Sequence, residues 1–314
     1  MTQRNIFITG GAGFIGRWLV NRCLQDGHAV TVYDNLCAGR LANLAEFQDR
    51  ITFYQADILD EEQLEAAMAE TQPDLVFHLA AHHFIPFCNE NPLETLRVNA
   101  EGTYAVLQQA ANAGVDTAVV ASSGVVYPSV DDPLTEDMDT VPPDVYGLSK
   151  LMTEQVAEHM AQTTNMTCVA ARLFNTYGAY ETNPHLIPHI VESLHAGPEI
   201  PLGNIYTKRD YIYVEDVANL LLQSALHATD SYSVVNVGTG MEYSAEEIVE
   251  VISDLIGTDI HIDVDQSRIR AVDKMHQRAD TTRLQQLTDT KAQHSLEDGL
   301  TKLLREEQLL TVPA

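Results

Sequence analysis

The chain has 314 residues, 45% of them hydrophobic, which is enough for one large domain or two small ones with a full core. Its 45 acidic residues against 18 basic ones give a formal net charge of −27, and a surface of that charge opposes binding to nucleic acid or anionic lipid. Because no run of about 18 apolar residues occurs, we expect no membrane-spanning helix.

The first predicted element is a short apolar strand over residues 5–9. A glycine-rich run, GGAGFIG at residues 10–16, follows at once and leads into a helical pattern. Glycines at such positions allow a tight turn and a close approach to a pyrophosphate, and the helix N-terminus offers free N–H groups. Because the run lies between a strand and a helix, as the motif requires, the sequence predicts a dinucleotide site here.

A second predicted strand, residues 29–33, leads into Asp34, which lies 18 residues after Gly16. A carboxylate there can accept hydrogen bonds from both ribose hydroxyls of NAD and would repel the 2′-phosphate of NADP. Arg40 is close enough in sequence to attract that phosphate, so NADP stays open as the less favoured cofactor.

Apolar runs and helical patterns continue to alternate, which predicts a parallel sheet with helices on both faces and ligands at the carboxyl ends of its strands. The further strands are expected near residues 51–55, 75–78, 117–121 and 167–171, and the helices near 15–25, 61–70, 92–113 and 146–162. After Asn175 the pattern becomes irregular and prolines interrupt it, although residues 234–237 again resemble a buried strand. We therefore expect a Rossmann-type doubly wound α/β fold with a smaller α/β C-terminal lobe. Residues 1–174 would form the NAD-binding domain, to which 233–250 return, and residues 175–314 would mainly bind substrate.

The helix predicted over residues 146–162 begins with Tyr146 and Lys150, which share a helix face because they lie four residues apart. An ammonium beside a phenol favours the phenolate and lowers the tyrosine pKa, which gives a general acid/base near neutral pH. This spacing is common by chance on solvated helices, but here it follows a dinucleotide motif. The pair is therefore a candidate catalytic pair.

The cysteines and histidines indicate neither disulfides nor a metal site. The four cysteines have no Cys-x-x-Cys spacing, and the 12 histidines have no His-Glu-x-x-His spacing. The chain passes from Met1 almost directly into the first strand, which leaves no room for a signal peptide. These features predict a cytoplasmic protein with free thiols.

With these features in place, the chain resembles the extended short-chain dehydrogenase/reductase family, and within it the nucleotide-sugar epimerases and dehydratases. Besides the glycine loop, the matches are HLAA at residues 78–81, SSGVVY at 122–127, RLFNTYG at 172–178 and KRDYIYVED at 208–216. They extend over almost the whole chain and are more specific for the family than for the substrate. The chain is most similar in type to the NAD-dependent nucleotide-sugar 4-epimerases.

The resemblance implies a role for each matched position. Ser123, Tyr146 and Lys150 would be catalytic, with Tyr146 as the acid/base and Lys150 on the nicotinamide ribose. The positions that would bind NAD are Gly10, Gly13, Phe14, Ile15, Gly16, Asp34, Asn35, Asp57, Ile58, Leu79, Ala80, Ala81, Asn99, Tyr146 and Lys150. Those that would bind a nucleotide-diphosphate sugar are Ser123, Asn175, Arg209 and Arg270. Relatives dimerise through helices that match 92–113 and 146–162, so a homodimer is expected.

Taken together, the resemblance implies that the protein is an NAD-dependent epimerase. It would invert C4 of a nucleotide sugar through a transient 4-keto intermediate. A 4,6-dehydratase or decarboxylase of the family is disfavoured, because Gly124 and Val125 stand where dehydratases carry two acids. A reductase of 4-keto nucleotide sugars would favour NADPH, which Asp34 disfavours. An NAD(H)-sensing binding protein on the same fold would commonly lose the tyrosine and lysine that this chain keeps.

Some positions depart from the family's pattern. Cys88 stands where many relatives have serine, and Pro128 stands where glycine is usual. His82 and His83, beside the cofactor strand, are unusual too. Either histidine could contact substrate, but a packed or solvent-facing side chain is the simpler expectation.

Overall fold

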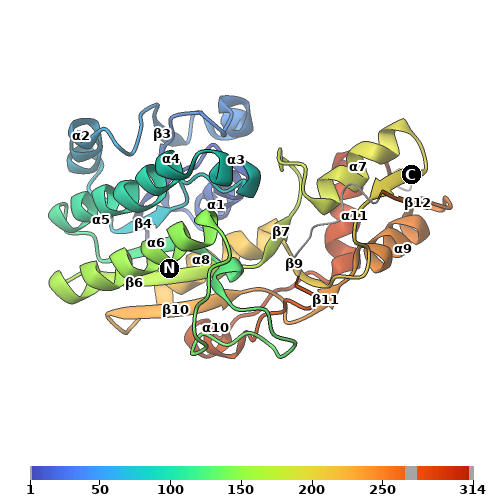
Figure 1. Ribbon diagram of the computed structural model, residues 1–314. Helices are drawn as coiled ribbons and strands as arrows, with labels where there is room; N and C mark the ends of the chain where they lie inside the picture. Colours follow the sequence, from blue (N-terminus) through green and yellow to red (C-terminus); the bar gives the residue numbers. More distant parts are fainter. Residues whose placement is uncertain (1, 266–273, 311–314) are drawn as a thin grey trace.

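The computed structural model describes residues 2–265 and 274–310. Seven parallel strands form the central sheet in the order β10-β6-β5-β4-β1-β2-β3 (Figure 1). They are β1 (Asn5–Thr9), β2 (Ala29–Tyr33), β3 (Ile51–Tyr54), β4 (Leu75–His78), β5 (Thr117–Ser123), β6 (Thr167–Leu173) and β10 (Tyr232–Val237). The strand order reverses between β1 and β4, which is where doubly wound sheets bind ligands. The expected Rossmann-type fold is thereby confirmed.

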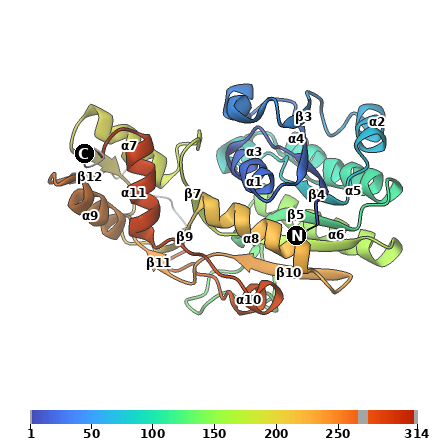
Figure 2. The same ribbon diagram turned by 180° about the vertical axis from the view of Figure 1, so that it is seen from behind.

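Helices cover both faces of this sheet, so its central strands are buried and apolar throughout. Helices α1 (Phe14–Gln25) and α8 (Val214–His227) pack together on one face (Figure 2). The other face carries α2 (Glu61–Thr71), α5 (Gly102–Asn112) and α6 (Val145–Thr163) (Figure 1). Three shorter segments precede α5: α3 (Ile85–Glu90), α4 (Pro92–Leu96) and a π-helix η2 (Arg97–Glu101). Two 3-10 turns follow strands: η1 (Leu41–Phe47) after β2 and η3 (Gly124–Val126) after β5.

A smaller lobe lies beside the carboxyl ends of the main strands (Figures 1 and 2). Its strands are β7 (Asn175–Tyr177), β8 (Glu199–Leu202), β9 (Arg209–Tyr213), β11 (Glu242–Tyr243) and β12 (His261–Val264). Its helices are α7 (Leu186–Ala196), α9 (Ala245–Ile256) and α11 (Leu296–Glu306), whereas α10 (Thr282–Thr288) packs near α8 and β10. The chain crosses between the two parts several times: α8 and β10 return to the main sheet, and α9 then lies with the small lobe (Figure 1).

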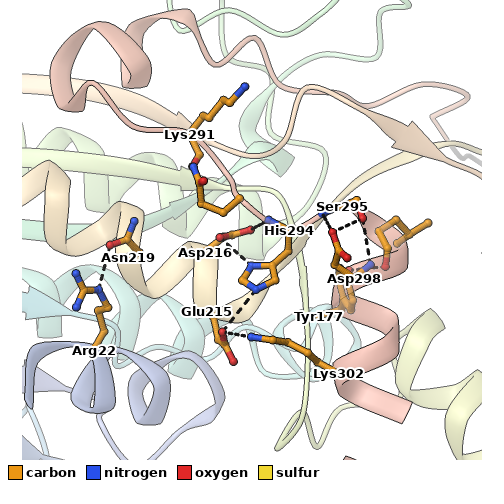
Figure 3. Close-up of polar contacts among 12 residues, drawn as sticks. Arg22, Tyr177, Glu215, Asp216, Asn219, Lys291, His294, Ser295, Asp298 and Lys302 are labelled. Atoms are coloured by element: carbon orange, nitrogen blue, oxygen red, sulfur yellow. Dashed lines mark hydrogen bonds and ion pairs between the residues drawn. The ribbon is translucent and has the colours of Figure 1, made fainter. Parts of the chain in front are cut away.

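Polar contacts fix helix α11 and the turn before it to the first turn of α8 (Figure 3). Lys302 Nζ donates to Glu215 Oε2 at 2.5 Å, and the backbone N–H of His294 donates to Asp216 Oδ2 at 2.9 Å. On the far side of α8, Arg22 Nε of α1 donates to Asn219 Oδ1 at 3.0 Å (Figure 3). Helix α8 is thus held both by the Rossmann part and by the C-terminal helix, so it links the two parts of the molecule.

Within the described part of the chain, no helix is both long and apolar enough to cross a membrane. The cysteines are all free thiols, and only Cys37 among them is exposed.

Candidate active site

A cavity of about 1360 Å³ lies between the carboxyl ends of the main strands and the small lobe. Both parts of the molecule line it, from Gly10 after β1 to Gln277 near the C-terminus. This is the position in which a doubly wound sheet binds its ligands. The sequence-predicted site residues can therefore be placed relative to one cavity.

The glycine loop forms the floor of one end of this cavity, and its geometry requires glycine. Gly10 has a φ of +71°, and a Cβ built on it would lie 2.7 Å from the backbone nitrogen of Ala80. A Cβ on Gly16 would lie 2.2 Å from the carbonyl oxygen of Gly10. Helix α1 begins here, and among the described residues no side chain caps its N-terminus. The loop thus offers a close backbone and free N–H groups, which is the cradle that a dinucleotide pyrophosphate needs.

Asp34 lines the cavity at the end of β2, where its carboxylate is buried and held by two backbone groups. Its Oδ2 accepts from Ala12 N at 3.0 Å, and its Oδ1 accepts from Leu36 N at 2.8 Å. Burial raises the pKa of Asp34, and the two N–H donors oppose that shift. The carboxylate is therefore fixed beside the glycine loop, at the place expected for ribose recognition. Together the loop and Asp34 fit NAD.

Ser123, Tyr146 and Lys150 come together on the same cavity, although they belong to a strand end and a helix. Asp144 caps α6 by accepting from Gly147 N at 2.8 Å, which starts the helix just before Tyr146. Ser123 Oγ accepts from Val125 N at 3.2 Å, and Ser123 also hydrogen-bonds the phenol of Tyr146. Lys150 Nζ donates to the carbonyl of Ala121 at 2.9 Å and lies 5.8 Å from the centre of the Tyr146 ring.

The expected lowering of the tyrosine pKa is wrong for the polypeptide alone. Burial raises the pKa of Tyr146 to about 12, and the hydrogen bond with Ser123 only partly opposes it. Burial also lowers the pKa of Lys150 to about 8, because an ammonium loses its hydration there. Desolvation thus disfavours the charged form of each group.

On the substrate side, Asn175 at the start of β7 and Arg209 on β9 both line the cavity. Arg209 Nη1 donates to the carbonyls of Lys208 at 2.8 Å and of Lys274 at 2.7 Å. Arg270, the second arginine expected to meet the diphosphate, lies outside the described residues.

The remaining predicted cofactor residues line the cavity with one exception. Those that line it are Gly13, Phe14, Ile15, Asn35, Asp57, Ile58, Leu79, Ala80 and Ala81. Asn99, in the π-helix η2, is buried one layer behind the cavity lining. Its Nδ2 donates to His82 O at 2.8 Å and Ser149 Oγ at 2.9 Å, and its Oδ1 accepts from His82 N at 2.7 Å. Asn99 therefore fixes the backbone beside the cavity.

The structure adds cavity residues that sequence reasoning did not assign. Lys274 Nζ donates to Tyr127 O at 2.7 Å, and Gln277 Nε2 donates to Gly124 O at 2.9 Å. Burial, and then the charge of Arg209, lower the pKa of Lys274. His83 and Glu181 also line the cavity. Only the unusual histidine gave a signal in the sequence, since the other three lie in segments without a recognisable pattern.

The fold and this cavity define a class of protein. The NAD dependent epimerase/dehydratase family model matches residues 6–238, and the chain belongs to that family.

Individual relatives and solved structures show which members of the family this chain is similar to. The chain is 33% identical over 304 residues to a UDP-glucose 4-epimerase of Mycolicibacterium smegmatis, which covers 94% of this chain and 96% of the relative. Among solved structures it is similar to UDP-glucose-4-epimerase from Stenotrophomonas maltophila with bound NAD and formylated UDP-arabinopyranose, at a TM-score of 0.91 and 27% identity, covering 98% of each chain. MoeE5, solved with UDP-glucuronic acid and NAD, matches at a TM-score of 0.86 and 26% identity and covers 97% of this chain and 98% of its own.

Proposed function

We propose that this protein is an NAD-dependent epimerase that inverts C4 of a nucleotide-diphosphate sugar. The observation that carries the proposal is that Ser123, Tyr146 and Lys150 line one cavity together with the glycine loop and Arg209. A proton-transfer group, a dinucleotide cradle and a cation for a diphosphate are thus within one site. We infer that the nucleotide is UDP, and the UDP-sugars in the names of the relatives support this inference.

In this mechanism the chain's own residues move a proton and hold the sugar. Tyr146 takes the proton of the sugar 4-hydroxyl when the 4-keto sugar forms, and it returns the proton after the sugar has turned over. Ser123 orients that proton through its hydrogen bond with the phenol. When bound, NAD supplies the acceptor and donor of the hydride at C4. Burial raises the pKa of Tyr146 to about 12 and the hydrogen bond with Ser123 opposes that rise, so the surrounding protein favours the phenol over the phenolate.

The diphosphate is held by Arg209 and, as the resemblance implies, by Arg270. Guanidinium groups bind phosphate oxygens with charge-assisted hydrogen bonds. The formal net charge of −27 makes such local cations necessary for a polyanionic substrate. Lys274 lies on the same side and adds a third cation to this part of the cavity.

Dehydration remains disfavoured, since Gly124 and Val125 follow Ser123 and neither can transfer a proton. Gly124 lies against the ring of Phe174, where an added Cβ would be 3.2 Å from Cζ. An acidic side chain at this position would therefore require the ring to move.

The direct test is to incubate the purified protein with a panel of UDP-sugars, without added reductant, and to identify products by NMR. We expect a 4-epimer of the substrate at equilibrium and NAD rather than NADP in the denatured extract. A dehydrated or decarboxylated product, or a strict requirement for NADPH, would contradict the proposal.

We further propose that the protein is a cytoplasmic two-fold dimer. Leu93 on α4, Tyr104 on α5 and Leu148 on α6 expose apolar surface on the helices through which relatives dimerise. Association would bury this surface, which is otherwise in contact with water.

A further inference from the structure

One wall of the cavity is formed by two segments that lie 100 residues apart in the sequence. His83 follows β4, and Asn183 lies in the turn between β7 and α7. Asn183 Nδ2 lies 2.7 Å from His83 Nε2. An amide nitrogen only donates, so this ring nitrogen accepts and the His83 ring is neutral in the contact. We call His83, Glu181, Asn183 and His185 the His83 wall; His83, Glu181 and His185 line the cavity.

The turn that carries Glu181 is fixed by a buried arginine. Tyr180 has a φ of 72°, in the left-handed region that a large side chain occupies only when its surroundings impose it. The guanidinium carbon of Arg17 lies 3.9 Å from the centre of the Tyr180 ring, and Arg17 Nη2 donates to the Tyr180 hydroxyl at 3.1 Å. Arg17 also forms an ion pair with Glu46. The backbone conformation before Glu181 is thereby fixed.

On the other side of the wall, the backbone at His83 is held as well. Asn99 binds both backbone groups of His82, and the ring of His83 hydrogen-bonds the backbone of Ala81. His83 therefore keeps its place in the lining of the cavity that Tyr146 and Lys150 also line. Loss of hydration lowers the pKa of His83, and the charges of His185 and then Lys150 act in the same direction.

Glu181 places a carboxylate in this wall. Only 4% of its side chain is exposed, and its Oε1 lies 3.6 Å from His185 Nδ1. Its charge opposes the lowering of the His83 pKa, so Glu181 and Lys150 act on the same ring. Glu181 and Tyr146 line the same cavity, so a sugar bound with its C4 at Tyr146 shares that cavity with the Glu181 carboxylate. A negative charge on that sugar would be repelled by the carboxylate.

We propose that Glu181, held in the His83 wall, restricts the sugar to uncharged pyranoses and rejects uronic acids. This inference rests on the proposed function and names its substrate class. Relatives of the same fold include MoeE5, solved with UDP-glucuronic acid, so the family scaffold alone does not impose the restriction. In this chain the restriction comes from the carboxylate of Glu181.

The test compares kcat/KM for UDP-glucose and UDP-glucuronic acid at pH 8, where an unperturbed histidine is neutral. The native protein should prefer UDP-glucose. In Glu181→Gln the preference should shrink by about 10- to 100-fold, because a repulsion between like charges is removed while the shape is kept. The gain should come from faster turnover of the uronate. The control is Glu192→Gln on α7, an exposed glutamate that does not line the cavity and should leave the ratio unchanged.

Equal turnover of both sugars by the native protein, or an unchanged ratio in Glu181→Gln, would overturn the inference and leave the proposed function intact. If the native protein turned over no UDP-sugar, the proposed function would fail. The Kd values of UDP-glucose and UDP-glucuronic acid would then be measured by calorimetry, with UDP alone as reference. Their ratio would be compared between the native protein and Glu181→Gln. In that measurement a Glu181→Gln variant that discriminates as the native protein does would overturn the inference.

Discussion

Tyr146 and Lys150 lie in a site where the protein opposes the charged forms of both. Burial raises the pKa of the phenol to about 12 and lowers that of the ammonium to about 8. Such perturbed pairs in a cavity are typical of residues that act in proton transfer.

Replacing Tyr146 by phenylalanine should remove turnover while substrate binding persists. Loss of a general acid/base costs about 10²- to 10⁴-fold in kcat, and the ring that fills the site is kept. Steady-state kinetics with UDP-glucose measure kcat, and calorimetry measures binding. The matched control is Tyr104→Phe on α5, outside the cavity lining, which should keep native activity. A Tyr146→Phe variant with near-native kcat would show that another group moves the proton.

Replacing Lys150 by methionine should change how stability depends on pH. The pKa of Lys150 in the folded protein is about 8, below its ordinary value of 10.5, so between these values the unfolded state binds more protons. Stability of the native protein should therefore rise with pH relative to Lys150→Met across this window. Below pH 8 the variant should be more stable by up to about 3 kcal/mol, and above about 10.5 the difference should vanish.

This difference would be measured by urea unfolding of protein freed of nucleotide. The control, Lys291→Met, removes an exposed lysine and should give a difference that does not change with pH. A flat difference for Lys150→Met as well would mean that Lys150 is not desolvated.

At the scale of elements, a buried ion pair ties helix α6 to the strand ends beside it. Arg172 on β6 donates through Nε and Nη2 to Glu154 on α6, at 2.8 and 2.7 Å. Ser122 at the end of β5 donates to the same carboxylate. Both charged side chains are 5% exposed. The helix that carries Tyr146 is thus fixed against the strand that carries Ser123.

The variant Arg172→Met should therefore lower the free energy of unfolding by about 3–5 kcal/mol, because Glu154 would remain buried without its partner. Chemical denaturation measures this loss. The double variant Arg172→Met/Glu154→Leu should recover much of it, since no charge is then left unpaired. For comparison, Arg4→Met breaks the exposed pair with Asp116 and should cost less than about 1 kcal/mol. A small loss in Arg172→Met would imply that Glu154 finds another partner or becomes protonated.

At the scale of the whole molecule, the proposed dimer would place α5 and α6 of two chains against each other. Light scattering at micromolar concentration should give twice the mass of one chain. Tyr104→Glu should give the mass of one chain, because it puts a charge into the apolar surface that association buries. Tyr206→Glu, at an exposed position in the small lobe, is the control and should remain dimeric. Monomeric native protein would contradict the proposal.

Much of the fold and part of the site could be predicted from the sequence because they depend on local patterns. The glycine loop between β1 and α1, and the alternation of strands and helices, are fixed by residues close together in the chain. The spacing of Tyr146 and Lys150 belongs to a single helix. Asp34 directly follows a strand, so the parallel sheet brings it to the carboxyl edge.

Other features were decided by tertiary structure alone, because they depend on segments that meet only after folding. The direction of the Tyr146 pKa shift follows from desolvation, which no local spacing reveals. The contact of His83 with Asn183 joins segments 100 residues apart. It gives a polar partner to a histidine for which the sequence predicted only a packed or solvent-facing side chain. Asn99 lies behind the cavity because its amide is engaged by His82 and Ser149. Local sequence thus determined which chemical groups the protein carries, and long-range packing determined their charge states and what they face.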